Sequence, residues 1–184
     1  MFDKLVVSIL VDEIVGGFLV SVPPGHVACI FDRGKGILPV IKGPGLHFKI
    51  PFWQVAKLFN AQTLEYNITR GIDLSNPEAF GDEPINTVTA DNKLVTVEGT
   101  ILFRINKNMI NELWENIGER FVSKIVRPVA RSRIRSVIAG YKFNEVITNH
   151  RKTIEHEIHQ ELDAIFNPKG LITEGVLLSE IRPL

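Results

Sequence analysis

The hydrophobic period of this chain changes once, and that change limits the folds that the chain can adopt. Up to Ile105 most apolar residues alternate in the two-residue pattern of β-strands, and from Asn108 onward they recur every three or four residues, as in helices. A last extended stretch, Gly170–Ile181, closes the sequence. Strands first, helices later and one strand at the end is the order of an α+β fold, so we predict a β-rich first half and a helical second half.

A β-hairpin is the clearest local prediction. Thr87–Thr89 and Leu94–Ile105 have strand patterns and flank the turn residues Asp91-Asn92-Lys93. Earlier in the chain, Ala56–Arg70 also has a strand pattern, whereas Asp73–Pro84 is polar and rich in turn residues. We therefore expect an exposed loop over 73–84.

Three helices are predicted in the second half, over Met109–Ile117, Glu119–Ala139 and Ile147–Phe166. Pro128 lies inside the second helix and predicts a kink or a break there, because proline has no N–H group to donate. In the third helix the apolar residues recur at near-heptad spacing. They include Ile154, Ile158 and Leu162.

The N-terminal segment is mostly apolar from Leu5 to Val22 but carries Asp12 and Glu13 in its middle. A central acidic residue costs roughly 2.5–3.5 kcal/mol on insertion, so a straight membrane span is marginal. On a helical wheel a polar stripe through Asp12 is opposed by an apolar one. The apolar stripe holds Val7, Leu10, Ile14 and Phe18. We expect a helix in or dipping into the membrane interface, with a helix packed against protein as the alternative.

A second apolar group crowds around Pro51. Its members are Phe48, Ile50, Phe52 and Trp53. Large apolar side chains at a turn are typical of a loop that dips into a membrane, and packing in the core explains them equally well. The lone Cys29 lies in a stretch that is apolar on both faces, so we interpret it as a small core residue.

No catalytic constellation is present in the sequence. It has no G-x-S-x-G, no Walker loop and no G-x-G-x-x-G, and His156 and His159 are one residue too close for the H-E-x-x-H pattern. We therefore predict a protein that is not an enzyme, without catalytic, cofactor-binding or metal-binding residues. The rival is a metal-dependent enzyme built on those two histidines and His150.

Basic residues gather in the second predicted helix, among them Arg127, Arg131 and Arg135. Such a stripe can bind nucleic acid or anionic lipid, pair with carboxylates of a neighbouring protomer, or face solvent. The chain has 21 basic and 21 acidic residues, and this zero net charge favours ion pairing over nucleic acid or lipid. The expected partners are Glu155, Glu157 and Glu161 of a neighbour. We predict an oligomer interface formed by these three arginines and the face of Ile154, Ile158 and Leu162.

Several motifs, in order and spacing, resemble the SPFH (stomatin, prohibitin and flotillin) family. The opening of that domain is similar to Val22-Pro-Pro-Gly25, Gly34-Lys-Gly36 and the run Gly43-Pro-Gly45-Leu-His-Phe48 with Pro51-Phe52. Its central hairpin is similar to Thr87–Asp91 with Val95–Ile105. Its helical half is similar to Arg127–Arg131, Val137–Gly140 and Phe143. The resemblance covers about Val22 to Leu184.

The resemblance implies a membrane-associated oligomeric scaffold that forms rings or cages, organises a membrane microdomain and regulates membrane proteins such as proteases or channels. The partners would be copies of itself or SPFH paralogues and the lipid bilayer, with no nucleic acid. The place would be a bacterial plasma membrane or the mitochondrial inner membrane. The alternative is a soluble oligomeric interaction module of the same fold, as in the shoulder of the vault particle.

The resemblance also divides the chain into three expected parts. Residues 1–21 would associate with the membrane, with Val7, Leu10, Ile14 and Phe18 as contacts, and Phe48, Phe52 and Trp53 would join them. Residues 22–107 would form a β-rich subdomain. Residues 108–184 would form an α/β subdomain, after which the family usually continues into a long coiled coil.

Overall fold

The strands in the described part of the chain form three separate sheets. A computed structural model describes residues 17–71, 80–148 and 150–184. The strands are β1 (Leu19–Val22), β2 (His26–Asp32), β3 (Gly36–Ile37), β4 (Gly45–Phe48), β5 (Gln54–Asn60), β6 (Leu64–Ile68), β7 (Phe80–Asp82), β8 (Ile85–Val88), β9 (Leu94–Ile105) and β10 (Leu171–Pro183). The helical elements are η1 (Lys107–Met109), α2 (Ile110–Asn116), η2 (Val122–Val126), α3 (Arg127–Ala139), α4 (Phe143–Ile147), α5 (Arg151–Phe166) and η3 (Asn167–Lys169). This α+β order, with a strand at the end, confirms the predicted fold class.

Strand β9 is the centre of the largest sheet. Along one edge it pairs antiparallel with β10, from Ile105 opposite Leu171 to Val95 opposite Pro183. Its other edge is shared by β8 and β6, which pair with successive parts of it. Strand β7 then adds to β6 in the parallel direction. The predicted hairpin is therefore confirmed as β8–β9, and the closing strand lies beside it in the sheet.

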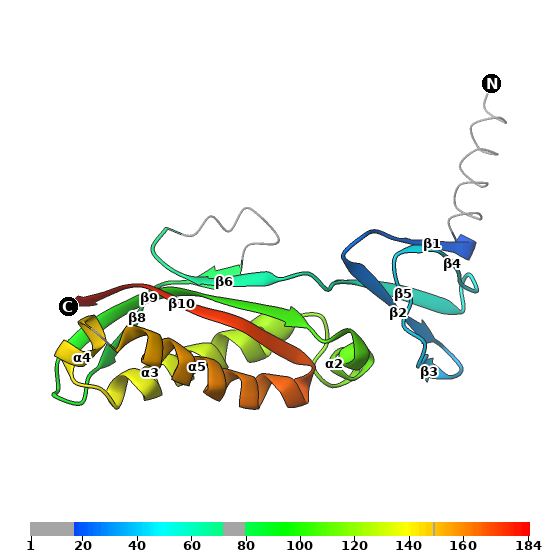
Figure 1. Cartoon of the computed structure of the whole chain (residues 1–184). Helices are drawn as coiled ribbons and strands as arrows, with labels where there is room; N and C mark the ends of the chain where they lie inside the picture. Colours follow the sequence, from blue (N-terminus) through cyan, green and yellow to red (C-terminus); the bar gives the residue numbers. More distant parts are fainter. Residues whose placement is uncertain (1–16, 72–79, 149) are drawn as a thin grey trace, which may run out of the picture.

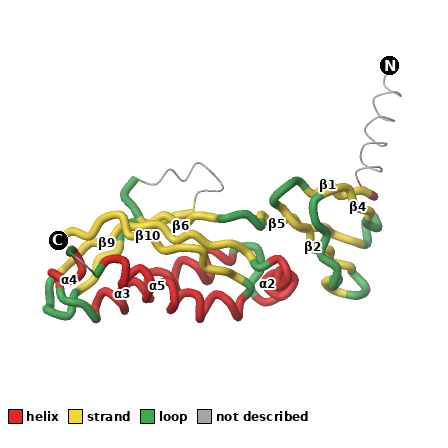
Figure 2. The backbone as a smooth tube through the Cα atoms, viewed as in Figure 1, coloured by secondary structure: helices red, strands yellow, loops and turns green. Residues whose placement is uncertain are grey.

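Helices α3 and α5 cover one face of this sheet, on the same side in both views of the backbone (Figures 1 and 2). The face of α5 that meets the sheet carries Ile154, Ile158, Leu162 and Phe166, and none of these side chains is exposed. Burying each contributes about 1.5–3 kcal/mol. These residues form the core of the single chain, so the expectation that Ile154, Ile158 and Leu162 present an oligomer face is corrected.

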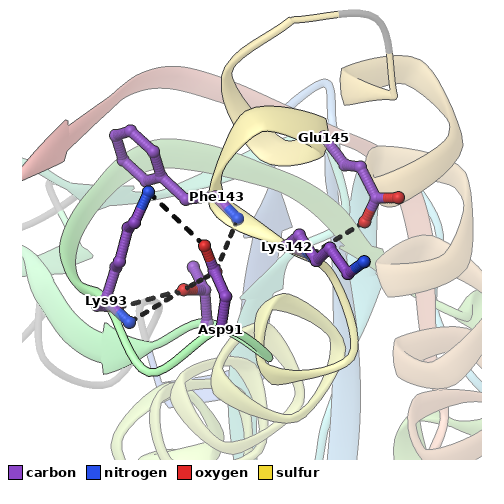
Figure 3. A network of polar contacts seen from close by, with 6 residues as sticks. Asp91, Lys93, Lys142, Phe143 and Glu145 are labelled. Atoms are coloured by element: carbon purple, nitrogen blue, oxygen red, sulfur yellow. Dashed lines mark hydrogen bonds and ion pairs between the residues drawn. The ribbon is translucent and has the colours of Figure 1, made fainter.

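The turn between β8 and β9 is tied to the start of α4. The carboxylate of Asp91 accepts a hydrogen bond from the backbone nitrogen of Phe143 at 2.8 Å and lies 3.5 Å from the Lys93 ammonium (Figure 3). Lys93 in turn sits 4.9 Å from the centre of the Phe143 ring. Hydrogen bonds from the Thr89 hydroxyl and from that backbone N–H lower the pKa of Asp91 to about 2. The hairpin predicted from local turn residues thus also fixes where α4 begins.

The second predicted helix is interrupted close to Pro128. Residues Val122–Val126 form a π-helical turn, and a regular α-helix begins at Arg127 with the proline in its first turn. Proline has no N–H group to donate, and it lies just after the Arg127 N–H reaches the Val122 carbonyl, where the hydrogen-bonding register of the helix changes. The predicted kink or break appears as this π turn, while the helical conformation continues without a gap from Phe121 to Ala139.

Strands β1 to β5 form a smaller lobe at one end of the molecule (Figure 1). It contains a three-stranded sheet in the order β3-β2-β5 and a two-stranded ladder of β1 and β4. Cys29 lies in the middle of β2 with no exposed surface, as predicted, and burial raises the pKa of its thiol to about 11. Phe59 packs edge-on against Trp114 of α2, with ring centroids 6.0 Å apart, and so joins this lobe to the helices.

Three features of the strands differ from the sequence predictions. The single strand expected over Ala56–Arg70 is two strands, β5 and β6, which belong to different sheets. Within the loop expected over 73–84, residues Phe80–Asp82 form strand β7, while 72–79 lie outside the described residues. The expected boundary near residue 107 assigns β6 to β9 to one subdomain and β10 to another. In the structure β6 to β9 share a sheet with β10.

Candidate functional site

Of the large apolar side chains exposed on the smaller lobe, six belong to the residue before β1, to β4 and to the turn after β4, and we call them the apolar rim. They are Phe18, Leu46, Phe48, Ile50, Phe52 and Trp53. Phe48 is 80% exposed and Phe52 is 91% exposed, so neither ring is used by the core. Single exposed apolar residues are common, but six within 36 residues of sequence are typical of an interaction surface.

The β1–β4 ladder sets the direction of the first rim residues. Phe48 lies opposite Leu19, and Leu46 lies opposite Ser21. Since side chains alternate along a strand, Leu46 and Phe48 point to the same face and His47 to the other. The ring of His47 is held on that other face by a hydrogen bond between Nε2 and the Gly43 carbonyl at 2.7 Å.

A closed turn presents the next rim residues. The backbone nitrogen of Gln54 donates to the Ile50 carbonyl at 2.8 Å, and the Gln54 side-chain oxygen accepts from the Ile50 nitrogen at 2.9 Å. Between them Phe52 has a φ of 62°, in the left-handed region that costs a bulky residue about 1–2 kcal/mol. An exposed phenyl ring held at a strained position gains nothing for the fold, and such strain is typical of functional sites.

Asp32, at the end of β2, anchors this turn. Its carboxylate accepts hydrogen bonds from Trp53 Nε1 at 3.1 Å and from Gln54 Nε2 at 2.9 Å. It also accepts from the backbone nitrogens of Gly34 at 2.9 Å and Lys35 at 3.1 Å. These bonds, that of Gln54 first, hold the pKa of Asp32 below its usual range, so the anchor is ionised at neutral pH. The turn of the rim is thereby joined to the turn between β2 and β3.

Two exposed cations lie beside this anchor. Arg33 donates its backbone nitrogen to the Trp53 carbonyl at 3.1 Å, and Lys35 lies two residues further along the same turn. Gly34, between them, comes so close to the indole that an added Cβ would be 3.4 Å from the ring. An aromatic side chain with neighbouring Lys or Arg is the usual arrangement at a membrane–water interface. The site therefore combines exposed apolar side chains with two neighbouring cations.

The structure brings together four of the seven predicted membrane contacts, namely Phe18, Phe48, Phe52 and Trp53. The other three, Val7, Leu10 and Ile14, lie outside the described residues. Phe18 is attached to the rim because its carbonyl accepts a hydrogen bond from the Lys49 backbone nitrogen at 2.8 Å. Leu46 and Asp32 were missed as site residues. The alternation of Leu46, Phe48 and Ile50 could have revealed Leu46, but no local signal marks Asp32 as a partner of Trp53, 21 residues away.

The arginine stripe of α3 is engaged within the chain. Arg127 Nε lies 2.6 Å from the Asp82 carboxylate, and Arg131 donates to the Glu83 carbonyl at 2.8 Å. Arg135 Nε reaches the Asn86 carbonyl at 3.4 Å. These partners come from β7, from the residues that follow it and from β8. Because the sequence does not predict β7 as a strand, it does not indicate these partners within the chain. The sequence therefore favours carboxylates of a neighbouring protomer.

The expected acidic partners also have contacts inside the chain. Glu155 accepts from the backbone nitrogen of Leu178 at 2.9 Å, and Glu157 accepts from the Tyr141 hydroxyl at 2.7 Å. Glu161 lies 3.6 Å from Arg133. An interface through Arg127, Arg131 and Arg135 stays a prediction, and it would have to form alongside these contacts.

Two features are absent from residues 17–71, 80–148 and 150–184. None of the helices there is both long enough and apolar enough to cross a bilayer. No group of three or more His, Cys, Asp or Glu side chains there could hold a metal ion. His156, one of the residues of the metal-enzyme alternative, instead has its Nε2 3.0 Å from the side-chain nitrogen of Gln160.

Comparison with known proteins gives a consistent result across most of the chain. The family model described as "SPFH domain / Band 7 family" matches residues 20–183. "Prohibitin 1" of Mus musculus is 26% identical over 168 residues, which cover 91% of this chain and 56% of that protein. "Prohibitin-1" of Saccharomyces cerevisiae is 24% identical over 161 residues, 88% of this chain and 50% of that protein. "Prohibitin-7, mitochondrial" of Arabidopsis thaliana is 23% identical over 146 residues, which cover 79% of this chain and 47% of that protein. The chain thus spans about half the length of the curated relatives it matches.

Proposed function

The chain belongs to the SPFH domain / Band 7 family, and from this premise we propose that it is a membrane-associated oligomeric scaffold. In this proposal the heads assemble into rings or cages that organise a membrane microdomain and regulate membrane proteins such as proteases or channels. The partners are the bilayer and further copies of this chain or its paralogues. The membrane is that of a bacterial cell or the mitochondrial inner membrane, and one relative is named as mitochondrial.

The apolar rim is the observation that carries the membrane part of the proposal. Its six side chains lie in one small lobe, at the end of the molecule where the described chain begins (Figure 1). Transfer of a fully exposed Phe side chain into an apolar phase contributes about 1.5–3 kcal/mol. Phe48 and Phe52 together therefore supply a few kcal/mol, enough for reversible attachment of one head and for firm attachment of many heads joined in a ring.

The strain at Phe52 supports the same conclusion. A glycine at that position would give the turn without the steric cost of the left-handed conformation. The chain instead carries a phenyl ring that is 91% exposed. If the ring enters the bilayer interface, the free energy of binding offsets the strain energy of the folded chain. If the ring stays in water, nothing offsets that strain energy.

Vesicle co-sedimentation tests this proposal. The variants are Phe52→Asp and Leu46→Asp in the rim, and the control is Leu177→Asp in β10, a leucine that is 53% exposed, compared with 65% for Leu46. We expect the wild type and the control to pellet with vesicles in high salt, and both rim variants to stay in the supernatant. Loss of pelleting in all three variants, or in none, would contradict attachment through the rim.

The alternative, a soluble oligomeric module of the same fold, makes the opposite prediction for the wild type. It would stay in the supernatant at every salt concentration while still eluting as an oligomer in size-exclusion chromatography. That result would reassign the apolar rim to contact with protein.

A further inference from the structure

A second surface lies in the larger lobe, away from the apolar rim. An open groove of about 700 Å³ is lined by residues of β8 and α3, which are in contact with each other, and we call it the β8–α3 groove. Its lining includes Asn86 and Val88 from the strand and Pro128, Ser132, Arg135 and Ser136 from the helix. The proposal made above for the rim uses none of these residues. Arg135 is one of the predicted interface residues.

The strand side of the groove is an open β-edge. In the ladder with β9, Thr87 lies opposite Val95, and the Thr89 nitrogen donates to the Lys93 carbonyl at 3.0 Å. Because the hydrogen-bonding direction alternates along an antiparallel strand, Ile85 and Thr87 face β9 while Asn86 and Val88 face outward. Among the described strands β8 pairs only with β9. The outward N–H and C=O groups of Asn86 and Val88 can therefore accept one more strand.

The helix side leaves room for that strand. Pro128, Ser132, Ser136 and Ala139 recur at four- and three-residue steps, so they form one exposed stripe of α3 facing the groove. Because their side chains are short, they leave the groove wide on the helix side. A larger residue at Ser132 or Ser136 would narrow the space between helix and strand.

The charge of the groove selects the kind of strand. Arg131 and Arg135 belong to its lining, which contains no acidic residue. Arg131 is engaged, since it lies 3.4 Å from Asp82 and donates to the Glu83 carbonyl. Arg135 makes only a long contact, 3.4 Å from Nε to the Asn86 carbonyl, and among the described residues no carboxylate lies within ion-pair distance of it. An incoming backbone N–H could take over the Asn86 carbonyl and leave the guanidinium free for a carboxylate.

We propose that the β8–α3 groove binds an extended acidic peptide segment of a partner protein. The segment adds a strand to the outward edge of β8 at Asn86 and Val88, and an acidic side chain on its helix-facing side pairs with Arg135. Backbone pairing supplies affinity without sequence preference, and the arginine and the narrow helix stripe supply the preference for acidic over basic segments.

The test uses a fluorescein-labelled peptide of alternating Glu and Val, which as a strand carries all its carboxylates on one face. Binding is followed by fluorescence anisotropy. The protein variants are Arg135→Glu in the groove and Lys152→Glu on the exposed face of α5, which change the net charge equally. We expect saturable binding that weakens at least about tenfold in Arg135→Glu and is unchanged in Lys152→Glu, because a like charge opposes the peptide only at the groove. A peptide with Lys in place of Glu should not bind.

A second measurement locates the peptide. Hydrogen exchange of the Asn86 and Val88 amides should slow when the peptide binds, and Val88→Pro, which removes an outward N–H without disturbing the ladder, should weaken binding. The proposal would be overturned if peptide binding weakened equally in Arg135→Glu and Lys152→Glu. It would also be overturned if the peptide bound without slowing hydrogen exchange at these amides. Self-association that Val88→Pro abolishes, with no binding of the acidic peptide, would also overturn it and make a second copy of the chain the occupant.

Discussion

The indole nitrogen of Trp53 donates a hydrogen bond to the carboxylate of Asp32 at 3.1 Å, and this contact joins the exposed rim to the end of β2. The same carboxylate accepts the side-chain amide of Gln54, next to Trp53. A buried polar group therefore positions an exposed apolar one, because the turn that displays Phe52 cannot move while both bonds hold. The two residues are separated by 21 positions in the chain.

Asp32→Asn should release the rim turn. The asparagine carbonyl can accept part of these bonds, but the charge that strengthens them is lost. In a Trp114→Phe background, we expect the emission of Trp53 at neutral pH to shift to longer wavelength in Asp32→Asn. The exposed Glu65→Gln is the control, and its emission should match that of the wild type.

The wild type should lose the same anchor in acid. The folded pKa of Asp32 is lowered, chiefly by the hydrogen bond from Gln54, so its stabilising effect is complete above the usual aspartate value of about 3.9. That effect is lost as the pH falls through the lower folded pKa. The Trp53 emission should therefore titrate below about pH 3.9 in the wild type and not in Asp32→Asn. A transition of the wild type at higher pH would show that another group holds the turn.

Phe52→Gly should stabilise the fold while it weakens membrane binding. Glycine adopts the φ of 62° without a steric cost, and its greater freedom in the unfolded chain offsets part of that gain. We expect the free energy of unfolding in urea to rise by roughly 0.5–1 kcal/mol. Phe48→Gly, in strand β4, should lower it by roughly the same amount, because glycine weakens a strand. A lower free energy of unfolding in both variants would mean that the Phe52 ring packs against the lobe.

Gly99→Ala should destabilise the pairing of β9 with β10. An added Cβ would lie 2.6 Å from the Leu177 carbonyl oxygen and 3.2 Å from the Leu178 Cα, both backbone atoms that cannot rotate away. Overpacking of this kind costs about 1–3 kcal/mol. The control is Gly43→Ala, where an added Cβ meets nothing within 4 Å, and its unfolding midpoint in urea should stay within error of the wild type.

Ile158→Ala should act on folding and not on assembly. Its side chain has no exposed surface beneath the sheet, so its loss should lower the free energy of unfolding by about 2–5 kcal/mol. Ile147→Ala, at a residue that is 46% exposed, should change it by no more than about 0.5 kcal/mol. Unchanged unfolding together with dissociation of oligomers in Ile158→Ala would restore the face of α5 as an interface.

Local features of the sequence predicted much of this protein. The change of period separated strands from helices, Asp91-Asn92-Lys93 marked the hairpin turn, and Pro128 marked the irregular part of the second predicted helix. These predictions hold because each depends on φ/ψ preferences or side-chain spacing within a few residues. The resemblance of the glycine and proline motifs likewise led to the family that the comparison supports.

Tertiary structure decided which apolar residues serve the core and which serve a surface. Phe103 in β9 and Phe48 in β4 both sit in alternating strands, yet one has no exposed surface and the other is 80% exposed. The same holds for charged residues. Arg127 pairs with Asp82 of β7, a strand that the sequence does not predict because the residues around it are polar. Sequence pattern determines the direction of a side chain relative to its own strand or helix. Only the packing of distant segments determines whether another layer of protein lies in that direction.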